Sequence, residues 1–245
     1  MASYFDERFE GAGYEESTWN EGLTFGGTFD EDASVPGGAP ADWASDCLHV
    51  IADPDDENSN FQAFAWINVT QKTVSYWLIE LYFTYLNVDV GANKRGIFAL
   101  TGESSSKSAI RSYVNGKSGG GHELNFQVYK NGSSGTNVGV VDVTTGTFYQ
   151  LEYKFDAPAN SWEIVLDGVS LFSGSDLIAG HVNNVDRIWV GTFLNTSGKI
   201  DLKADKVLAD DAAWIIGPSE EGPTEQIERG IVRPSVQEVI QYAWR

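Results

Sequence analysis

Cysteine is almost absent from the chain, which contains only Cys47. A single cysteine excludes an intrachain disulfide, so no covalent cross-link can hold the fold together. The three histidines, His49, His122 and His181, are scattered and do not show the His/Cys spacing of a zinc site. The fold must therefore rest on a hydrophobic core, and a chain of 245 residues is long enough to build one.

Basic residues are also few. Lysine and arginine number 16 against 35 aspartates and glutamates, which gives a formal net charge of −19. This balance excludes a nucleic-acid partner, because phosphate backbones are bound by basic surfaces. The surplus of carboxylates is typical of a solvated surface, and it is also compatible with cation binding.

Targeting signals and long apolar runs are missing as well. Residues 1–7 contain no basic region followed by an apolar stretch, so we expect no secretory signal peptide. No stretch approaches the roughly 20 apolar residues of a membrane-spanning helix, and we expect no membrane partner. The sequence thus predicts a cytoplasmic protein that is not exported by the secretory route.

The clearest pattern that is present is a hairpin between Phe148 and Gly168. Its first half carries large apolar side chains at every second position, namely Tyr149, Leu151, Tyr153 and Phe155. This period of two predicts a strand with one solvated face. Residues 157–160, Ala-Pro-Ala-Asn, mark the turn, and Asp167-Gly168 is a tight-turn dipeptide that ends the second strand.

This hairpin resembles one found in concanavalin A-like and laminin-G-like jelly rolls. In that superfamily a strand of the form W/Y-x-L-x-x-x-x-D leads through a loop to a strand ending in Leu/Val-x-Asp-Gly. The corresponding positions here are Tyr149, Leu151, Asp156, Leu166, Asp167 and Gly168. The opening YFDERFEG of residues 4–11 and the closing KADKVLADDAAWIIGP of residues 203–218 resemble the first and last strands of the same superfamily.

The resemblance covers residues 4–216 and implies an all-β fold, a two-sheet antiparallel β-sandwich or jelly roll, in a domain of residues 1–216. Turn signals separate about twelve short strands, which is the spacing of a sandwich. The segment from Thr73 to Asp89 is almost continuously apolar and rich in β-branched and aromatic residues. It is predicted to be a central strand, covered on both faces.

Residues 217–245 differ in character from the rest. A polar linker with Pro218, Gly222 and Pro223 precedes RPSVQEVIQYAWR, in which Ser235 and Glu238 have capping-box spacing. One helical face of this segment would carry apolar side chains, and the predicted partner-docking residues are Val236, Val239, Ile240 and Trp244. So short a helix must dock, either on its own sandwich or on a partner.

A structural calcium ion is implied by the resemblance alone. In many members of the superfamily it bridges the first and last strands, and Glu10 and Asp205 match the positions of two ligands. Oxygen ligands of this kind suit Ca²⁺. The alternative is that both are ordinary surface carboxylates.

The resemblance also implies a glycan-binding face on one of the sheets. The side chains predicted to line it are Tyr76, Glu80, Tyr82, Arg111, Tyr113, Glu123, Asn125, Gln127 and Trp189. Aromatic rings can pack on the C–H faces of sugars, while amides and carboxylates can bind the hydroxyls. The alternative is that many of the aromatic residues belong to the core or are covered by a loop, and a slip of one residue would reverse the choice of face.

Signatures of catalysis are absent. Laminarinase-like relatives carry E-x-D-x-x-E on one strand, and the nearest match here, around Glu80, has Leu81 and Phe83 in conflict with it. The R-x-E-x-R and Q-I-H motifs of alginate-lyase-like relatives are missing, and so are Ser/His/Asp and phosphate-loop patterns. The remaining possibility for catalysis is that Glu80 and Glu123 face each other across strands. We therefore predict that the protein is not an enzyme.

Together these features predict a non-catalytic glycan-binding or capping module in a larger assembly. A lectin-like fold without an export signal, followed by an attachment-like terminus, resembles a capsid decoration or fibre protein of a phage virion. The virion would then be its location. Two alternatives remain: a polysaccharide-active hydrolase or lyase, and a purely structural assembly protein.

Overall fold

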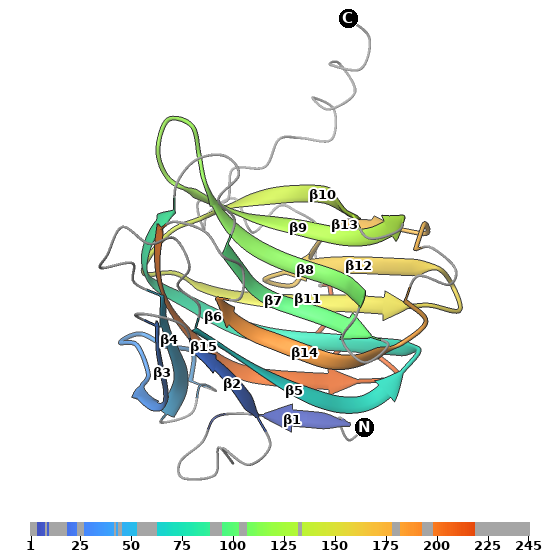
Figure 1. The fold of residues 1–245 in the computed structure, drawn as a ribbon, viewed down its shortest axis with the longest axis horizontal. Helices are drawn as coiled ribbons and strands as arrows, with labels where there is room; N and C mark the ends of the chain where they lie inside the picture. The colour runs from blue at the N-terminus through green and yellow to red at the C-terminus, as the bar shows by residue number, and fades with distance from the viewer. Residues whose placement is uncertain are drawn as a thin grey trace, which may run out of the picture.

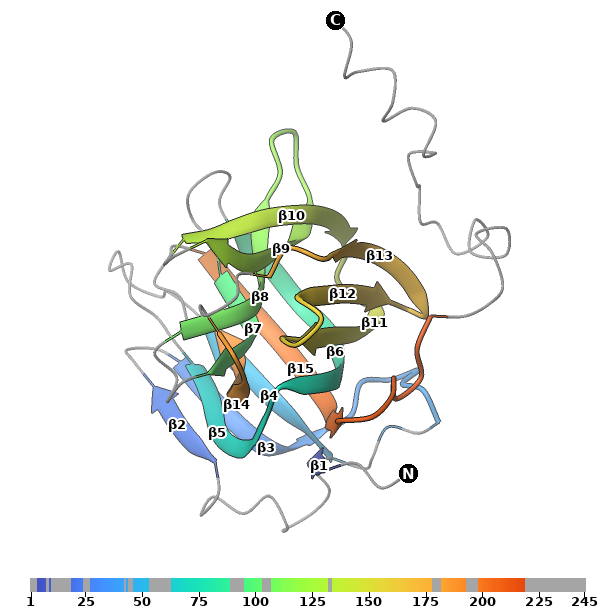
Figure 2. The ribbon, with the colours of Figure 1, turned by 90° about the vertical axis from the view of Figure 1, so that its right-hand side faces the viewer.

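The computed structural model describes residues 4–7, 9, 19–23, 27–41, 43, 46–52, 63–88, 95–102, 107–131, 134–177, 182–192 and 198–218. These residues form fifteen strands in two antiparallel sheets of eight and seven strands. The sheets lie face to face as two layers (Figures 1 and 2). The predicted all-β two-sheet sandwich is confirmed.

The eight-stranded sheet is called sheet A here, and the seven-stranded one sheet B. Sheet A has the order β13 (Val169–Gly174), β12 (Ser161–Leu166), β11 (Phe148–Asp156), β6 (Val74–Val88), β15 (Gly198–Asp210), β4 (Asp46–Ala52), β3 (Gly27–Ser34), and β1 (Phe5–Glu7) also pairs with β15. Sheet B has the order β10 (Ser134–Val143), β9 (His122–Asn131), β8 (Lys107–Gly116), β7 (Arg95–Gly102), β14 (Val185–Thr192), β5 (Ala63–Lys72), β2 (Asn20–Leu23).

The predicted hairpin is formed by β11 and β12. Leu151 pairs with Leu166 and Phe155 with Trp162, and all four side chains point into the core. Two turn residues have positive φ, Asn160 (52°) between β11 and β12 and Asp167 (49°) between β12 and β13, as expected for short polar side chains at turn positions. This hairpin joins the centre of sheet A because β11 also pairs with β6 along its whole length.

The longest strand, β6, lies between β11 and β15, and it confirms the predicted central strand. Its inward residues, including Trp77 and Phe83, are fully buried between the sheets. Its outward residues are mostly covered as well. The near-continuous apolar sequence reflects this double coverage.

A buried tyrosine in the core links the two sheets through its hydroxyl group. Tyr153 of β11 stacks on Phe98 of β7, with ring centroids 4.9 Å apart and an interplanar angle of 18°. The hydroxyls of Tyr153 and Ser112 of β8 lie 2.7 Å apart and form a buried hydrogen bond between the sheets. Burial raises the pKa of Tyr153 well above its usual value, so this hydroxyl stays protonated.

Candidate functional site

The nine predicted glycan-binding residues lie on two different faces. Tyr76, Glu80 and Tyr82 belong to β6 in sheet A, whereas the other six belong to β8, β9 and β14 in sheet B. The prediction of one shared face is therefore wrong for the three residues of β6. Glu80 and Glu123 are in different sheets and point outward from them, so they do not face each other across paired strands.

The outer face of sheet A is covered at Tyr76 and Tyr82. Residues 211–218, called the C-terminal strap here, leave the end of β15, where Figure 2 shows them in orange-red. Trp214 of the strap packs edge-on against Tyr76, with centroids 5.2 Å apart. Tyr82 packs on Phe148, at 4.6 Å, and Phe148 in turn contacts Trp43. These contacts explain why β6 is apolar on both sides.

A buried ion pair lies on the same face. The Lys206 amine is 3.2 Å from the Glu80 carboxylate, and both side chains are only 6% exposed. The Gln150 side-chain amide donates a further hydrogen bond of 3.1 Å to Glu80. Lys206 occupies a β-bulge with a left-handed φ of 49°, next to the fully buried Asp205. Such a pair is a structural element rather than a surface for a ligand.

The structure describes only one of the two predicted calcium ligands. Asp205 lies in β15, opposite Glu80 of β6, whereas Glu10 lies outside the described residues. Within the part of the chain that the structure describes, no three His, Cys, Asp or Glu side chains are grouped to hold a metal ion. The calcium site stays a prediction.

The outer face of sheet B carries a continuous line of paired side chains. Register pairs connect six strands, from β5 through β14, β7, β8 and β9 to β10. We call this line the cross-strand row, and its members are Trp66, Trp189, Ala99, Arg111, Gln127 and Asn137. Five spacings between neighbouring strands give it a length of roughly 24 Å.

The row begins with an aromatic cluster. Trp189 lies between Phe64 and Trp66, with ring centroids 5.3 and 5.7 Å away. The indole N–H of Trp189 donates to the Thr101 hydroxyl at 3.2 Å, which fixes the ring. The guanidinium of Arg187 lies over Trp66, 3.9 Å from its centroid. All three rings are half-buried, so part of each remains accessible.

The sequence analysis did not include Phe64, Trp66 and Arg187 among the predicted glycan-binding residues, although the pattern of β5 could have pointed to the two rings. In β5 the small residues Ala63 and Ala65 are fully buried, and the large rings that alternate with them, Phe64 and Trp66, point outward. An ordinary amphipathic strand has the opposite arrangement, with large apolar residues inside. Outward aromatic residues beside inward alanines make this face the candidate binding surface.

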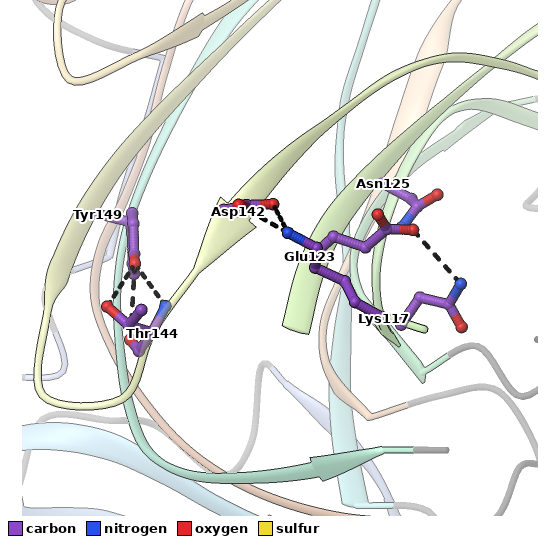
Figure 3. A network of polar contacts seen from close by, with 7 residues as sticks. Lys117, Glu123, Asn125, Asp142, Thr144 and Tyr149 are labelled. Atoms are coloured by element: carbon purple, nitrogen blue, oxygen red, sulfur yellow. Dashed lines mark hydrogen bonds and ion pairs between the residues drawn. The ribbon is translucent and has the colours of Figure 1, made fainter. Parts of the chain in front are cut away.

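The other end of the row is a network of amides and carboxylates at β8, β9 and β10 (Figure 3). The Asn125 amide donates to Glu123 at 3.0 Å, and the Asn137 amide donates to the side-chain oxygen of Asn125 at 3.2 Å. Lys117 binds both carboxylate oxygens of Asp142 at 2.7 Å. The network therefore holds its side chains in fixed orientations.

Exposure differs among the six predicted residues of sheet B. Tyr113 and Asn125 are 1% and 2% exposed, so the alternative of covered side chains holds for these two. Arg111, Glu123, Gln127 and Trp189 are half-buried and remain accessible in part. The accessible part of the face is thus aromatic at β5 and β14 and polar at β8 and β9.

The predicted docking residues of the tail, Val236, Val239, Ile240 and Trp244, lie outside the described residues. The domain boundary predicted after residue 216 stays a prediction. The strap nevertheless continues the contacts of the sandwich to Gly217, whose N–H donates to Glu152 at 2.8 Å. In the described part of the chain, no helix is long and apolar enough to cross a membrane.

Comparison with known proteins gives no matching family model and no matching curated protein, but many similar solved structures. One is the cellulose-induced protein Cip1, with a TM-score of 0.60, 15% identity, and coverage of 85% of this chain and 97% of that one. Another is a carbohydrate esterase of Shiga toxin-encoding bacteriophage phi24B, with a TM-score of 0.55, 11% identity, and coverage of 86% and 99%. A sialidase matches with a TM-score of 0.55 and 14% identity, over 86% of this chain and 18% of that one. These likenesses, all at 15% identity or less, show the concanavalin A-like β-sandwich fold alone.

Proposed function

We propose that the protein is a non-catalytic carbohydrate-binding module whose ligand lies on the outer face of sheet B. The observation that carries this proposal is the reversed strand β5, which places Phe64 and Trp66 outward beside Trp189. Partly exposed rings offer apolar surfaces to sugar C–H groups, and the partly exposed side chains of Arg111 and Gln127 can bind hydroxyls. The fold supports the proposal only by analogy, because one fold hosts many functions.

Binding is favoured over catalysis by the engagement of the carboxylates on this face. Glu123 pairs in register with Asp142 across β9 and β10. Glu123 accepts hydrogen bonds from Asn125 and Asn115, and Asp142 is bound by Lys117. General acid–base or nucleophilic work on a glycosidic bond requires two carboxylates that are free to act on the substrate, whereas Glu123 is held by two amides and Asp142, although 71% exposed, is paired with Lys117. In this proposal the carboxylates of Glu123 and Asp142 hold the neighbouring amide and amine side chains in place instead.

Replacing Trp189 with alanine is expected to weaken glycan binding by at least about tenfold, because aromatic anchors carry most of the energy of such contacts. The measurement is a screen of the full chain against soluble polysaccharides, followed by titration of any ligand found. Tyr85→Ala is the matched control, because Tyr85 is an aromatic residue of sheet A that is 45% exposed, away from the proposed face. This control should bind like the wild type.

Two results would contradict the proposal. Equal affinity of the Trp189→Ala variant and the wild type, with both folded, would place the ligand elsewhere. Release of new reducing ends or unsaturated sugars, abolished by Glu123→Gln, would establish the hydrolase or lyase alternative.

We further propose that the module is an accessory component of a larger assembly, such as the decoration or fibre of a phage virion. Support comes from the sequence of residues 219–245, where a polar linker precedes an apolar helical pattern. Truncation after Pro218 keeps the strap and is expected to convert an oligomer to a stable monomer, as measured by mass in solution. If the full chain and the truncated chain have the same number of subunits in solution, residues 219–245 do not drive self-association.

A further inference from the structure

Arg111 lies on the outer face of sheet B, in the middle of the cross-strand row. Arg111 of β8 forms no ion pair with the part of the chain that the structure describes, and its buried Nε has no hydrogen-bond acceptor there. Its guanidinium lies over the ring of Tyr129, 5.2 Å from the centroid. The chain has 35 acidic residues against 16 basic ones, so carboxylates to pair with it are abundant.

The position of Arg111 in the sheet explains why it has no acidic partner among the described residues. Its register neighbours in the cross-strand row are Ala99 and Gln127, neither of which is charged. Glu123 is the acidic residue of β9, and it lies four residues from Gln127 along the strand, roughly 13 Å away. A half-buried cation that the described residues do not neutralise favours an anion from outside.

Arg187, the other arginine of this face, is differently placed. Its guanidinium stacks on Trp66, and its Nε donates to the Asn68 side chain at 2.8 Å. Arg187 therefore supports the aromatic end of the row, whereas Arg111 lies in the middle of the row.

We propose that the cross-strand row binds an anionic polysaccharide, and that Arg111 is the residue that recognises its charged groups. The inference rests on the proposed function and gives its ligand class: sugars that carry a carboxylate or a sulfate group. The planar guanidinium can donate two parallel hydrogen bonds to either group. Trp189 and its neighbours would hold the sugar rings at the adjoining end of the row.

The net charge of −19 opposes such a contact only weakly at physiological salt. Screening reduces interactions between exposed charges beyond about 8 Å, so the remote carboxylates act weakly on a bound chain. The local charge at Arg111 then determines the selectivity.

The test compares neutral and anionic forms of one polymer, for example mannan and polymannuronate, with a sulfated mannan as a third ligand. Titration of the full chain is expected to show tighter binding of an anionic form, by roughly tenfold or more. Arg111→Gln should abolish this preference, so that the ratio of the affinities for the anionic and neutral polymers falls to about one. Arg111→Lys should keep part of the preference, and Trp189→Ala should weaken all ligands alike.

The outcomes separate this inference from the proposed function. Equal binding of neutral and anionic forms by the wild type, or an anionic preference that survives in Arg111→Gln, would overturn the role of Arg111 and leave carbohydrate binding intact. Absence of binding to all glycans in the wider screen would overturn both. A stronger response to the uronate or to the sulfated form identifies which anion the row recognises, and either one supports the inference.

Discussion

Replacing Lys206 with methionine is expected to lower the free energy of unfolding by about 3–5 kcal/mol, because it leaves the buried Glu80 carboxylate without its cation. Both side chains are 6% exposed and lie 3.2 Å apart, so water cannot replace the lost partner. Asp205, which is fully buried, lies opposite Glu80 in the sheet. A loss of this size is a large part of the stability of an ordinary domain.

The choice of methionine keeps other effects constant. It has nearly the length of lysine and suffers the same left-handed strain at a φ of 49°. Lys203→Met is the matched control on the same strand, since the Lys203 amine binds the backbone carbonyl of Ser34 at an exposed position. We expect this control to cost less than about 1 kcal/mol.

Denaturant unfolding of four proteins measures the coupling: wild type, Lys206→Met, Glu80→Met and the double variant. The double variant is expected to be more stable than the sum of the single losses predicts, by about 2 kcal/mol, because neither partner is left as an unpaired charge. Additive losses, or a cost below 1 kcal/mol for Lys206→Met, would show that the pair is open to water.

The fold was largely predictable from local patterns. The hairpin of residues 148–168 and the central strand around residues 74–88 both follow from side-chain alternation and apolar run length. The β-bulge at Lys206 and the ion pair with Glu80 were not predictable, because both depend on pairing between segments more than a hundred residues apart. No local pattern distinguishes a solvated charge from one that a distant segment will cover.

The candidate site was predictable only in part. Alternation identified Arg111, Gln127 and Trp189 as outward residues, but it could not assign β6 to a different sheet from β8. The cross-strand row also depends on register shifts, for example between Asn137 and Gly139, and a slip of one residue would reverse a face. The outward rings of β5, by contrast, could have been found from the Ala-Phe-Ala-Trp pattern alone.

Replacing Glu152 with alanine is expected to release the C-terminal strap and to cost about 2–3 kcal/mol of stability. The Glu152 carboxylate, 1% exposed, accepts the backbone N–H groups of Ile216 and Gly217 at 3.2 and 2.8 Å. Without it, these donors lose their acceptor, and the packing of Trp214 on Tyr76 loses its anchor. Glu163→Ala on the neighbouring strand is the control, since its partner is the hydroxyl of Ser170 at the surface.

The same carboxylate gives the strap a pH dependence of defined sign. Burial raises the pKa of Glu152 above its usual range, although the hydrogen bonds from Gly217 and Ile216 oppose the rise. The folded state therefore binds this proton more tightly than the unfolded chain does. The contribution of Glu152 to stability is highest below the unfolded pKa of about 4.3 and falls as the pH rises through the folded pKa.

Hydrogen exchange at the strap amides and unfolding curves across this pH range provide the measurement. In Glu152→Ala the amides of Ile216 and Gly217 should exchange at least about tenfold faster, and the part of the pH slope due to this group should disappear. Glu163→Ala should keep both the slow exchange and the slope. Unchanged exchange in Glu152→Ala would mean that the packing of Trp214 on Tyr76 holds the strap without help from the carboxylate.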